Sequence, residues 1–122
     1  MILPIKKKWF DMIKSGEKKE EYREIKPYYA TRFRNVFGAV VVPRSVFGGS
    51  MYPMLLQGNN VCSEIRKAAV QQVIFRNGYG SSDPAIVAEC RLRIGEGKTE
   101  WGAEPGQLYF VLDIIKLLDI NG

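Results

Sequence analysis

Two long β-type segments near the end of the chain constrain its fold most. Residues 85–94 and 108–118 are rich in aliphatic and aromatic side chains, and the turn-rich stretch GEGKTEWGAEPG joins them. Apolar runs bounded by Gly and Pro are typical of paired strands. Shorter β-type and helical segments precede this pair, so the order indicates a small α+β protein whose strands can curl into a barrel.

The first part of the chain predicts alternating short elements. These are a strand, a helix, a strand and a second helix, over residues 2–5, 7–15, 18–25 and 27–34. Pro4 limits the first strand to a sheet edge, because proline cannot donate to a ladder. Gly16 follows the first helix, where a left-handed residue ends helices, and Pro27 suits the first turn of the second. Trp9 and Phe10 are expected in the core.

The middle of the chain predicts a buried strand over residues 37–42, from the apolar run FGAVVV. Residues 43–60 are rich in Gly, Pro, Ser and Asn and are expected to form a long loop. A third helix is predicted over residues 61–72 and a strand over residues 73–76.

Length and composition indicate one domain over residues 1–122, with 46% hydrophobic and 25% charged residues. No apolar run approaches the roughly 18 residues of a membrane span, so we expect a cytoplasmic protein without membrane contact. Cys62 and Cys90 lie far apart without a CxxC spacing. In that compartment we expect two reduced thiols that are not bonded to each other.

The chain has no histidine. Catalysis by a Ser-His-Asp or Cys-His arrangement and zinc sites that contain His are therefore excluded, and two cysteines cannot form a Cys₄ site. We expect no metal site, and the sequence requires no cofactor, since the common dinucleotide and P-loop motifs are also missing. Any general acid or base must be a carboxylate, Lys, Tyr or Cys.

The positive charge is concentrated in the first third of the chain. Residues 1–44 contain eleven Lys and Arg against five Asp and Glu, a net charge of +6, whereas the remainder contains seven against eight, a net charge of −1. Such asymmetry favours a polyanionic partner. The alternative is a basic surface that only keeps the protein soluble.

The stretch GEKKEEYRE concentrates charge directly after the first predicted helix. Lys18 can meet a phosphate or a developing oxyanion, Glu21 can act as a general base, and Arg23 can grip a phosphate. The alternative is a solvated edge with surface ion pairs, which contribute little stability. Strand alternation places Lys18 opposite Glu21 and Arg23, so convergence requires Lys18 to precede regular pairing or a bulge to reset the register.

Gly16-x-Lys18-x-x-Glu21-x-Arg23 resembles the G-x-K-x-x-E-x-R motif of the ASCH domain family. The stretches IKKKWFDMIKSGEKKEEYREIKPYY, VIFRNGYG and GKTEWGAEPGQLYFVLDI are also similar to members of a bacterial and phage branch. The resemblance implies a PUA-like fold: a curved, mostly antiparallel β-barrel with two or three helices covering its openings. It also implies an association with RNA. In a branch that deacetylates a modified cytidine, a Thr stands where this chain has Glu21.

Three functions follow as hypotheses. The first is binding of RNA or a nucleotide in a polar cleft, with Lys18 and Arg23 assisted by a phosphate track and by stacking aromatics, namely Lys6, Lys8, Tyr79 and Trp101. The second is hydrolysis in the same cleft, by a ribonuclease or an amidohydrolase acting on a modified nucleoside, with Lys18 and Glu21 as catalytic residues. The third is a protein-interaction module that uses the apolar side chains of the 43–60 loop. For each residue a purely structural or solvated role is the alternative.

Overall fold

The computed structural model describes residues 1–38 and 70–121. In chain order, its elements are β1 (Ile2–Pro4), α1 (Lys7–Lys14), β2 (Glu20–Glu24), α2 (Pro27–Phe37), β3 (Val70–Arg76), β4 (Ala85–Glu96), the short 3₁₀ helix η1 (Thr99–Trp101) and β5 (Leu108–Asn121). The described residues are therefore α+β, as predicted. Among them, no helix is long and apolar enough to cross a membrane.

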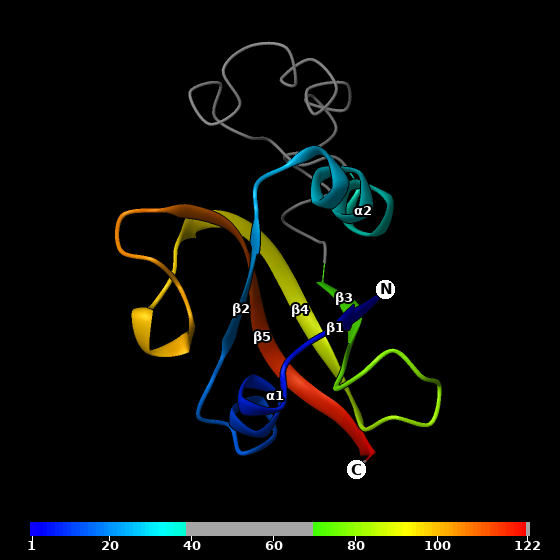
Figure 1. Cartoon of the computed structure of the whole chain (residues 1–122). Helices are drawn as coiled ribbons and strands as arrows, with labels where there is room; N and C mark the ends of the chain where they lie inside the picture. The colour runs from blue at the N-terminus through cyan, green and yellow to red at the C-terminus, as the bar shows by residue number, and fades with distance from the viewer. Residues whose placement is uncertain (39–69, 122) are drawn as a thin grey trace.

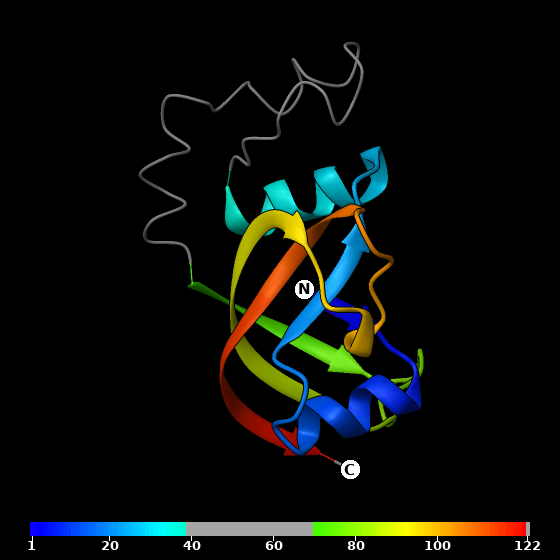
Figure 2. The same ribbon diagram turned by 90° about the vertical axis from the view of Figure 1, so that its left-hand side faces the viewer.

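The five described strands form one curled sheet in the order β1-β3-β4-β5-β2. β1 pairs in parallel with β3, and the other three pairings are antiparallel. The long β4–β5 hairpin bends through two register shifts, and the sheet takes the shape of a half-barrel (Figure 1). In the side view, α2 lies at one end of this half-barrel and α1 at the other (Figure 2). Of the expected barrel, the curvature, the mostly antiparallel pairing and two helices at its ends are confirmed, and the five described strands form a half-barrel.

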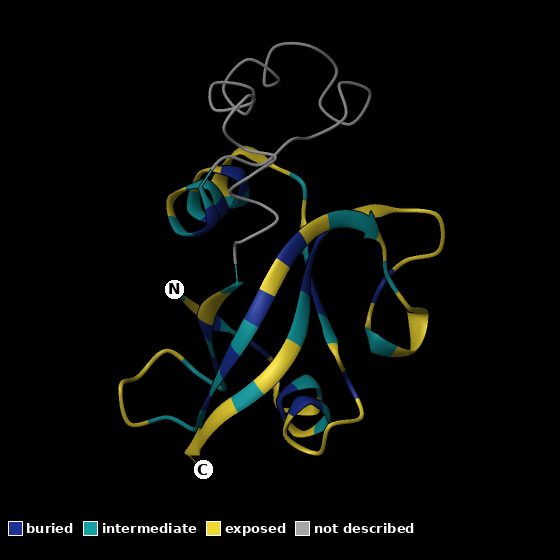
Figure 3. Ribbon diagram, turned by 180° about the vertical axis from the view of Figure 1, so that it is seen from behind, coloured by how far each residue is buried: buried dark blue, intermediate teal, exposed yellow. Residues whose placement is uncertain are grey.

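The core lies on the concave side of the sheet. β4 shows the alternation expected of a strand with one covered face: Ile86, Ala88 and Cys90 are buried, and the residues between them are partly exposed. α2 contributes Phe33, whose ring lies edge-on to Phe110 of β5 with centroids 5.1 Å apart. Figure 3 shows this striping along the sheet from behind. Cys90 is a free thiol, and Cys62 lies outside the described residues.

Two predicted elements are wrong where the structure describes them. Phe37 ends α2 and does not begin a strand, because the buried face formed by Ala30 and Phe33 continues to it at helical spacing. Val70 to Gln72 belong to β3 and not to a third helix, since they pair with Arg91 to Glu89 of β4. The rest of both predicted elements and the 43–60 loop lie outside the described residues.

Candidate functional site

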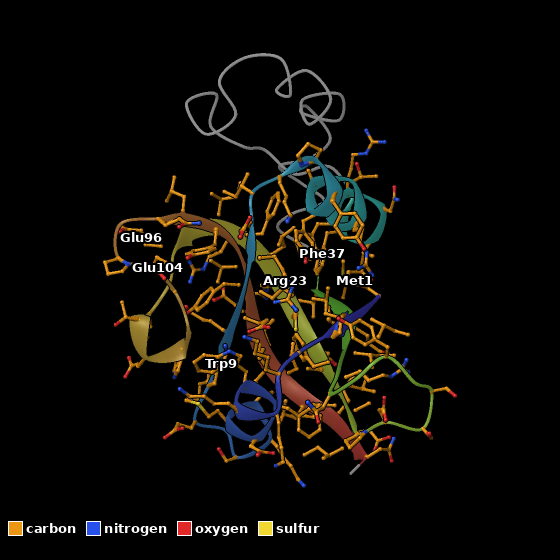
Figure 4. All side chains as sticks on the ribbon, in the orientation of Figure 1. Met1, Trp9, Arg23, Phe37, Glu96 and Glu104 are labelled. Atoms are coloured by element: carbon orange, nitrogen blue, oxygen red, sulfur yellow. The ribbon has the colours of Figure 1, made fainter. Side chains whose placement is uncertain are left out.

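A cleft of about 550 Å³ opens between α1, β2 and the segment that joins β4 to β5. Figure 4 marks Trp9 on α1, Arg23 on β2 and Glu104 in the joining segment. The polar lining of the cleft includes four cationic side chains, Lys6, Lys18, Arg23 and Lys26, and three carboxylates, Glu21, Glu24 and Glu104. Its aromatic lining is Trp9, Tyr22, Tyr29, Tyr79, Trp101 and Tyr109. The cleft is thus a mixed aromatic and charged surface with a slight excess of positive charge.

Lys18, Glu21 and Arg23 converge in this cleft. Lys18 precedes β2, and its backbone N–H donates to the carbonyl of Met12 in α1 at 3.0 Å, so it lies in the turn and not in the regular pairing. Lys18 Nζ lies 2.8 Å from Glu21 Oε1, and Arg23 Nη1 lies 2.6 Å from Glu21 Oε2. The convergence that the motif required is therefore present, although the roles of the three residues stay predictions.

The ammonium group of Lys18 is fully engaged by protein. Besides Glu21, it donates to the carbonyl of Trp101 at 2.7 Å, and it lies 4.2 Å from the centre of the Trp9 ring. Its side chain is only 1% exposed. Burial lowers the pKa of Lys18, and the nearby Glu21 carboxylate opposes that effect. A ligand can reach this ammonium only by displacing one of its partners.

Three side chains from β2 and its neighbourhood hold the segment over residues 97–107, here called the wall segment. The hydroxyl of Tyr22 accepts from Lys98 N at 2.9 Å, and the hydroxyl of Tyr109 accepts from Glu104 N at 2.9 Å. The Lys18–Trp101 hydrogen bond fixes the middle. Gly97 approaches the Tyr22 ring so closely that an added Cβ would lie 2.6 Å from it. The wall segment is thus tied near its start, middle and end.

The two tyrosines are themselves well positioned. Their rings pack with centroids 5.6 Å apart, and the hydroxyl of Tyr22 also donates to Glu20 Oε1 at 2.8 Å. Burial raises the pKa of Tyr22, so this hydroxyl keeps its proton, and with it the hydrogen bond that it donates to Glu20, further into the alkaline range than an exposed tyrosine would.

The structure brings most of the predicted site residues together. Lys6, Tyr79 and Trp101 line the cleft with the three motif residues, and Tyr79 is 89% exposed at its rim. Lys8 does not line the cleft, and its ammonium lies 4.6 Å from the centre of the Trp9 ring.

The prediction that Trp9 belongs to the core is wrong, because its ring is partly exposed in the cleft, whereas Phe10 is buried as predicted. The sequence analysis also missed Tyr22 and Tyr109. Tyr22 could have been predicted, because it lies inside the motif between Glu21 and Arg23. Among the described residues, no group of three or more His, Cys, Asp or Glu side chains could hold a metal ion.

No protein-family model, curated protein or solved structure matches the chain.

Proposed function

We propose that this protein is an ASCH-type domain of the PUA-like class that binds RNA or a nucleotide in the cleft around Lys18, Glu21 and Arg23. The resemblance of the G-x-K-x-x-E-x-R stretch supports the family, and the curled sheet with a helix at each end is compatible with a PUA-like barrel.

The observation that carries the binding function is the combination of aromatic rings and cations in one cleft. A volume of about 550 Å³ suits a nucleotide-sized ligand. Tyr79 and Trp101 offer faces on which a base can stack, and Lys6 and Lys26 offer charges for phosphates. Arg23 lines the cleft, and its side chain is 14% exposed. Neither a catalytic group nor a metal is needed for such a ligand to bind.

The chain supplies its own probe for this function. Both of its tryptophans, Trp9 and Trp101, line the cleft, so intrinsic fluorescence reports occupancy directly. Titration with mononucleotides and with short single-stranded RNA should quench this fluorescence in a saturable way. Tyr79→Ala should weaken binding by about 1–3 kcal/mol, the usual contribution of one stacked base.

Tyr28→Ala is the matched control, because Tyr28 is also exposed, at 59%, but lies on α2 and not in the cleft. Equal losses in the two variants, or no saturable quenching at low salt, would reject the proposal.

A hydrolase in the same cleft is the second candidate, and the Lys18–Glu21 pair favours it. A lysine with a lowered pKa beside a buried carboxylate is an arrangement that proton transfer can use. The assay is release of acid from N-acylated nucleosides and cleavage of single-stranded RNA, with Glu21→Gln as the inactive comparison. Turnover that Glu21→Gln leaves unchanged would assign the activity to a contaminant. The protein-interaction hypothesis concerns residues 43–60, which lie outside the described residues.

A further inference from the structure

A second cavity, of about 400 Å³, is lined in part by the loop between β3 and β4. The same loop contributes Tyr79 to the cleft and Ser81, Ser82 and Asp83 to this cavity. Strand residues complete its lining, most notably Arg76 at the end of β3 and Asn121 at the end of β5. The loop is closed by a hydrogen bond from Asn77 N to the carbonyl of Pro84 at 2.8 Å, so its two ends are fixed.

One N–H donor of Arg76 has no hydrogen-bond acceptor. Its Nε is buried, and it is the one buried side-chain nitrogen or oxygen without a hydrogen-bond partner among residues 1–38 and 70–121. Leaving such a donor unpaired costs about 1–3 kcal/mol, and more when the group is charged. A guanidinium has five N–H donors in a planar fork, which matches the oxygens of a phosphate or carboxylate.

The carboxylate that lines the cavity does not accept from Arg76 Nε. Asp83 lines the cavity but forms no ion pair with Arg76 in the described structure. Its Oδ2 instead accepts from Gly80 N at 2.8 Å and lies so close to Gly78 that a Cβ there would clash with it. Asp83 is therefore committed to shaping the loop.

We propose that Arg76, Ser81, Ser82 and Asn121 form a second anion site, which takes a phosphate group. Arg76 supplies the charge and the fork, and the serine hydroxyls supply neutral donors. The amide of Asn121, whose Nδ2 donates to Asp119 Oδ2 at a long 3.4 Å, has a second N–H for the phosphate. The phosphate can be free, or it can belong to a strand whose base occupies the cleft to which the same loop contributes Tyr79. The second version rests on the proposed function and the first does not.

The first experiment uses inorganic phosphate and the full chain. Titration at constant ionic strength, with chloride as the balancing anion, should shift the Arg76 Nε–H resonance in a saturable way. Arg91 on β4 is exposed and supplies the internal control, whose Nε–H should move only with bulk salt. Arg76→Met should weaken phosphate binding by about tenfold or more, and Arg91→Met should leave it unchanged.

Asp83→Asn distinguishes a phosphate site at Arg76 from an ion pair that Arg76 and Asp83 form in solution. The asparagine carbonyl can still accept from Gly80 N, so the loop is kept while one negative charge is removed. If phosphate occupies the site, affinity should rise in Asp83→Asn. If Arg76 instead pairs with Asp83 in solution, the wild type will show no saturable phosphate shift at Arg76 and Asp83→Asn will lower stability, and the proposal is overturned. Equal shifts of the Arg76 and Arg91 resonances, which would mean an adventitious ion only, overturn it as well.

The second experiment distinguishes the two sources of phosphate. If a strand phosphate is bound, Arg76→Met should lower affinity for a short oligonucleotide by about tenfold and leave that for a mononucleotide unchanged. If only free phosphate binds, the Arg76 resonance will respond to phosphate while both nucleotide affinities stay as in the wild type. If the wild type binds neither nucleotide, the proposed function fails, and the phosphate titration still decides the Arg76 site.

Discussion

Arg23 Nη2 donates to the carbonyl of Pro4 at 3.0 Å, and this hydrogen bond joins the two edge strands of the sheet. β2 and β1 stand at opposite ends of the strand order, so no ladder connects them. The same guanidinium reaches Glu21 and the carbonyl of Tyr22. A residue of the candidate site therefore also closes the half-barrel by side-chain hydrogen bonds where the backbone leaves it open.

Arg23→Met should lower the free energy of unfolding by about 1.5–3 kcal/mol, because Glu21 and two backbone carbonyls each lose a charged donor. Denaturant titration measures the loss. Arg23→Lys keeps the charge but not the planar fork, so it should recover only part of the stability. Full recovery by lysine would mean that charge alone, and not the bridge from β2 to β1, matters.

Lys18 and Glu21 should show strong coupling in a double-mutant cycle. Removing either partner leaves a buried charge, so Lys18→Met and Glu21→Gln should each cost about 3–5 kcal/mol of stability. The double variant Lys18→Met with Glu21→Gln should cost clearly less than the sum of the two. Chemical unfolding of all four proteins gives the coupling, and simple additivity would contradict the ion pair. Loss of activity in either single variant is interpretable only after folding has been checked.

Lys6 and Lys8 should differ in their effect on RNA binding, although they are two residues apart. Lys6 lines the cleft and Lys8 does not. If Lys6 contacts one phosphate, Lys6→Ala should reduce the slope of log K against log salt by about 0.7, and Lys8→Ala should change it little. Fluorescence titrations over a range of salt concentrations measure both slopes. A larger change for Lys8→Ala would place the phosphate track outside the cleft.

Tyr22→Phe should loosen the wall segment. The change removes the acceptor of Lys98 N, so it should cost about 1–3 kcal/mol and speed hydrogen exchange at that amide. Tyr28→Phe is the control, because Tyr28 is exposed on α2 and, among the described residues, its hydroxyl accepts from Arg32 at 3.2 Å and not from a backbone amide. Unchanged exchange at Lys98 in Tyr22→Phe would show that the hydroxyl does not hold the segment.

Because of Cys90, the free energy of unfolding should fall as the pH becomes alkaline. Burial raises the pKa of its thiol from 9.0 to about 12, with a smaller contribution from Asp113. The unfolded thiol loses its proton first, so the stabilising contribution is complete below pH 9 and is lost as the pH rises towards 12. The difference in unfolding free energy between wild type and Cys90→Ala should fall in that window, with a slope approaching about 1.4 kcal/mol per pH unit. A constant difference would contradict a buried thiol.

The sequence predicted the elements whose signals are local. Pro4, Gly16 and Pro27 mark boundaries through backbone geometry, and β4 and β5 have long β-type patterns. The wrong assignments occurred where an apolar run fits helix and strand equally well. Phe37 is one such case, because only its packing beside Phe33 shows that the helix continues to it.

The candidate site was predictable only in part. The spacing of two residues predicts that Glu21 and Arg23 share one face of a strand. The end of the helix at Gly16 allows Lys18 to lie before that strand. Trp9 was assigned to the core, because its helical position marks an inward face without saying whether that face meets core or cleft. Tyr109 is far from the motif in sequence, and only the pairing of β5 with β2 places it there.

The attachment of the wall segment determines when the cleft can form during synthesis of the chain. Its three hydrogen bonds join Lys18 to Trp101, Tyr22 to Lys98, and Tyr109 to Glu104, and the first two span 83 and 76 residues of chain. Contacts between distant residues carry a large loop-closure cost and form late in folding. During synthesis, a chain that has been made only as far as β4 has neither the wall segment nor the strand that pairs with β2. Its buried lysine then has no carbonyl partner on the wall, so the cleft can take shape only once β5 has been released.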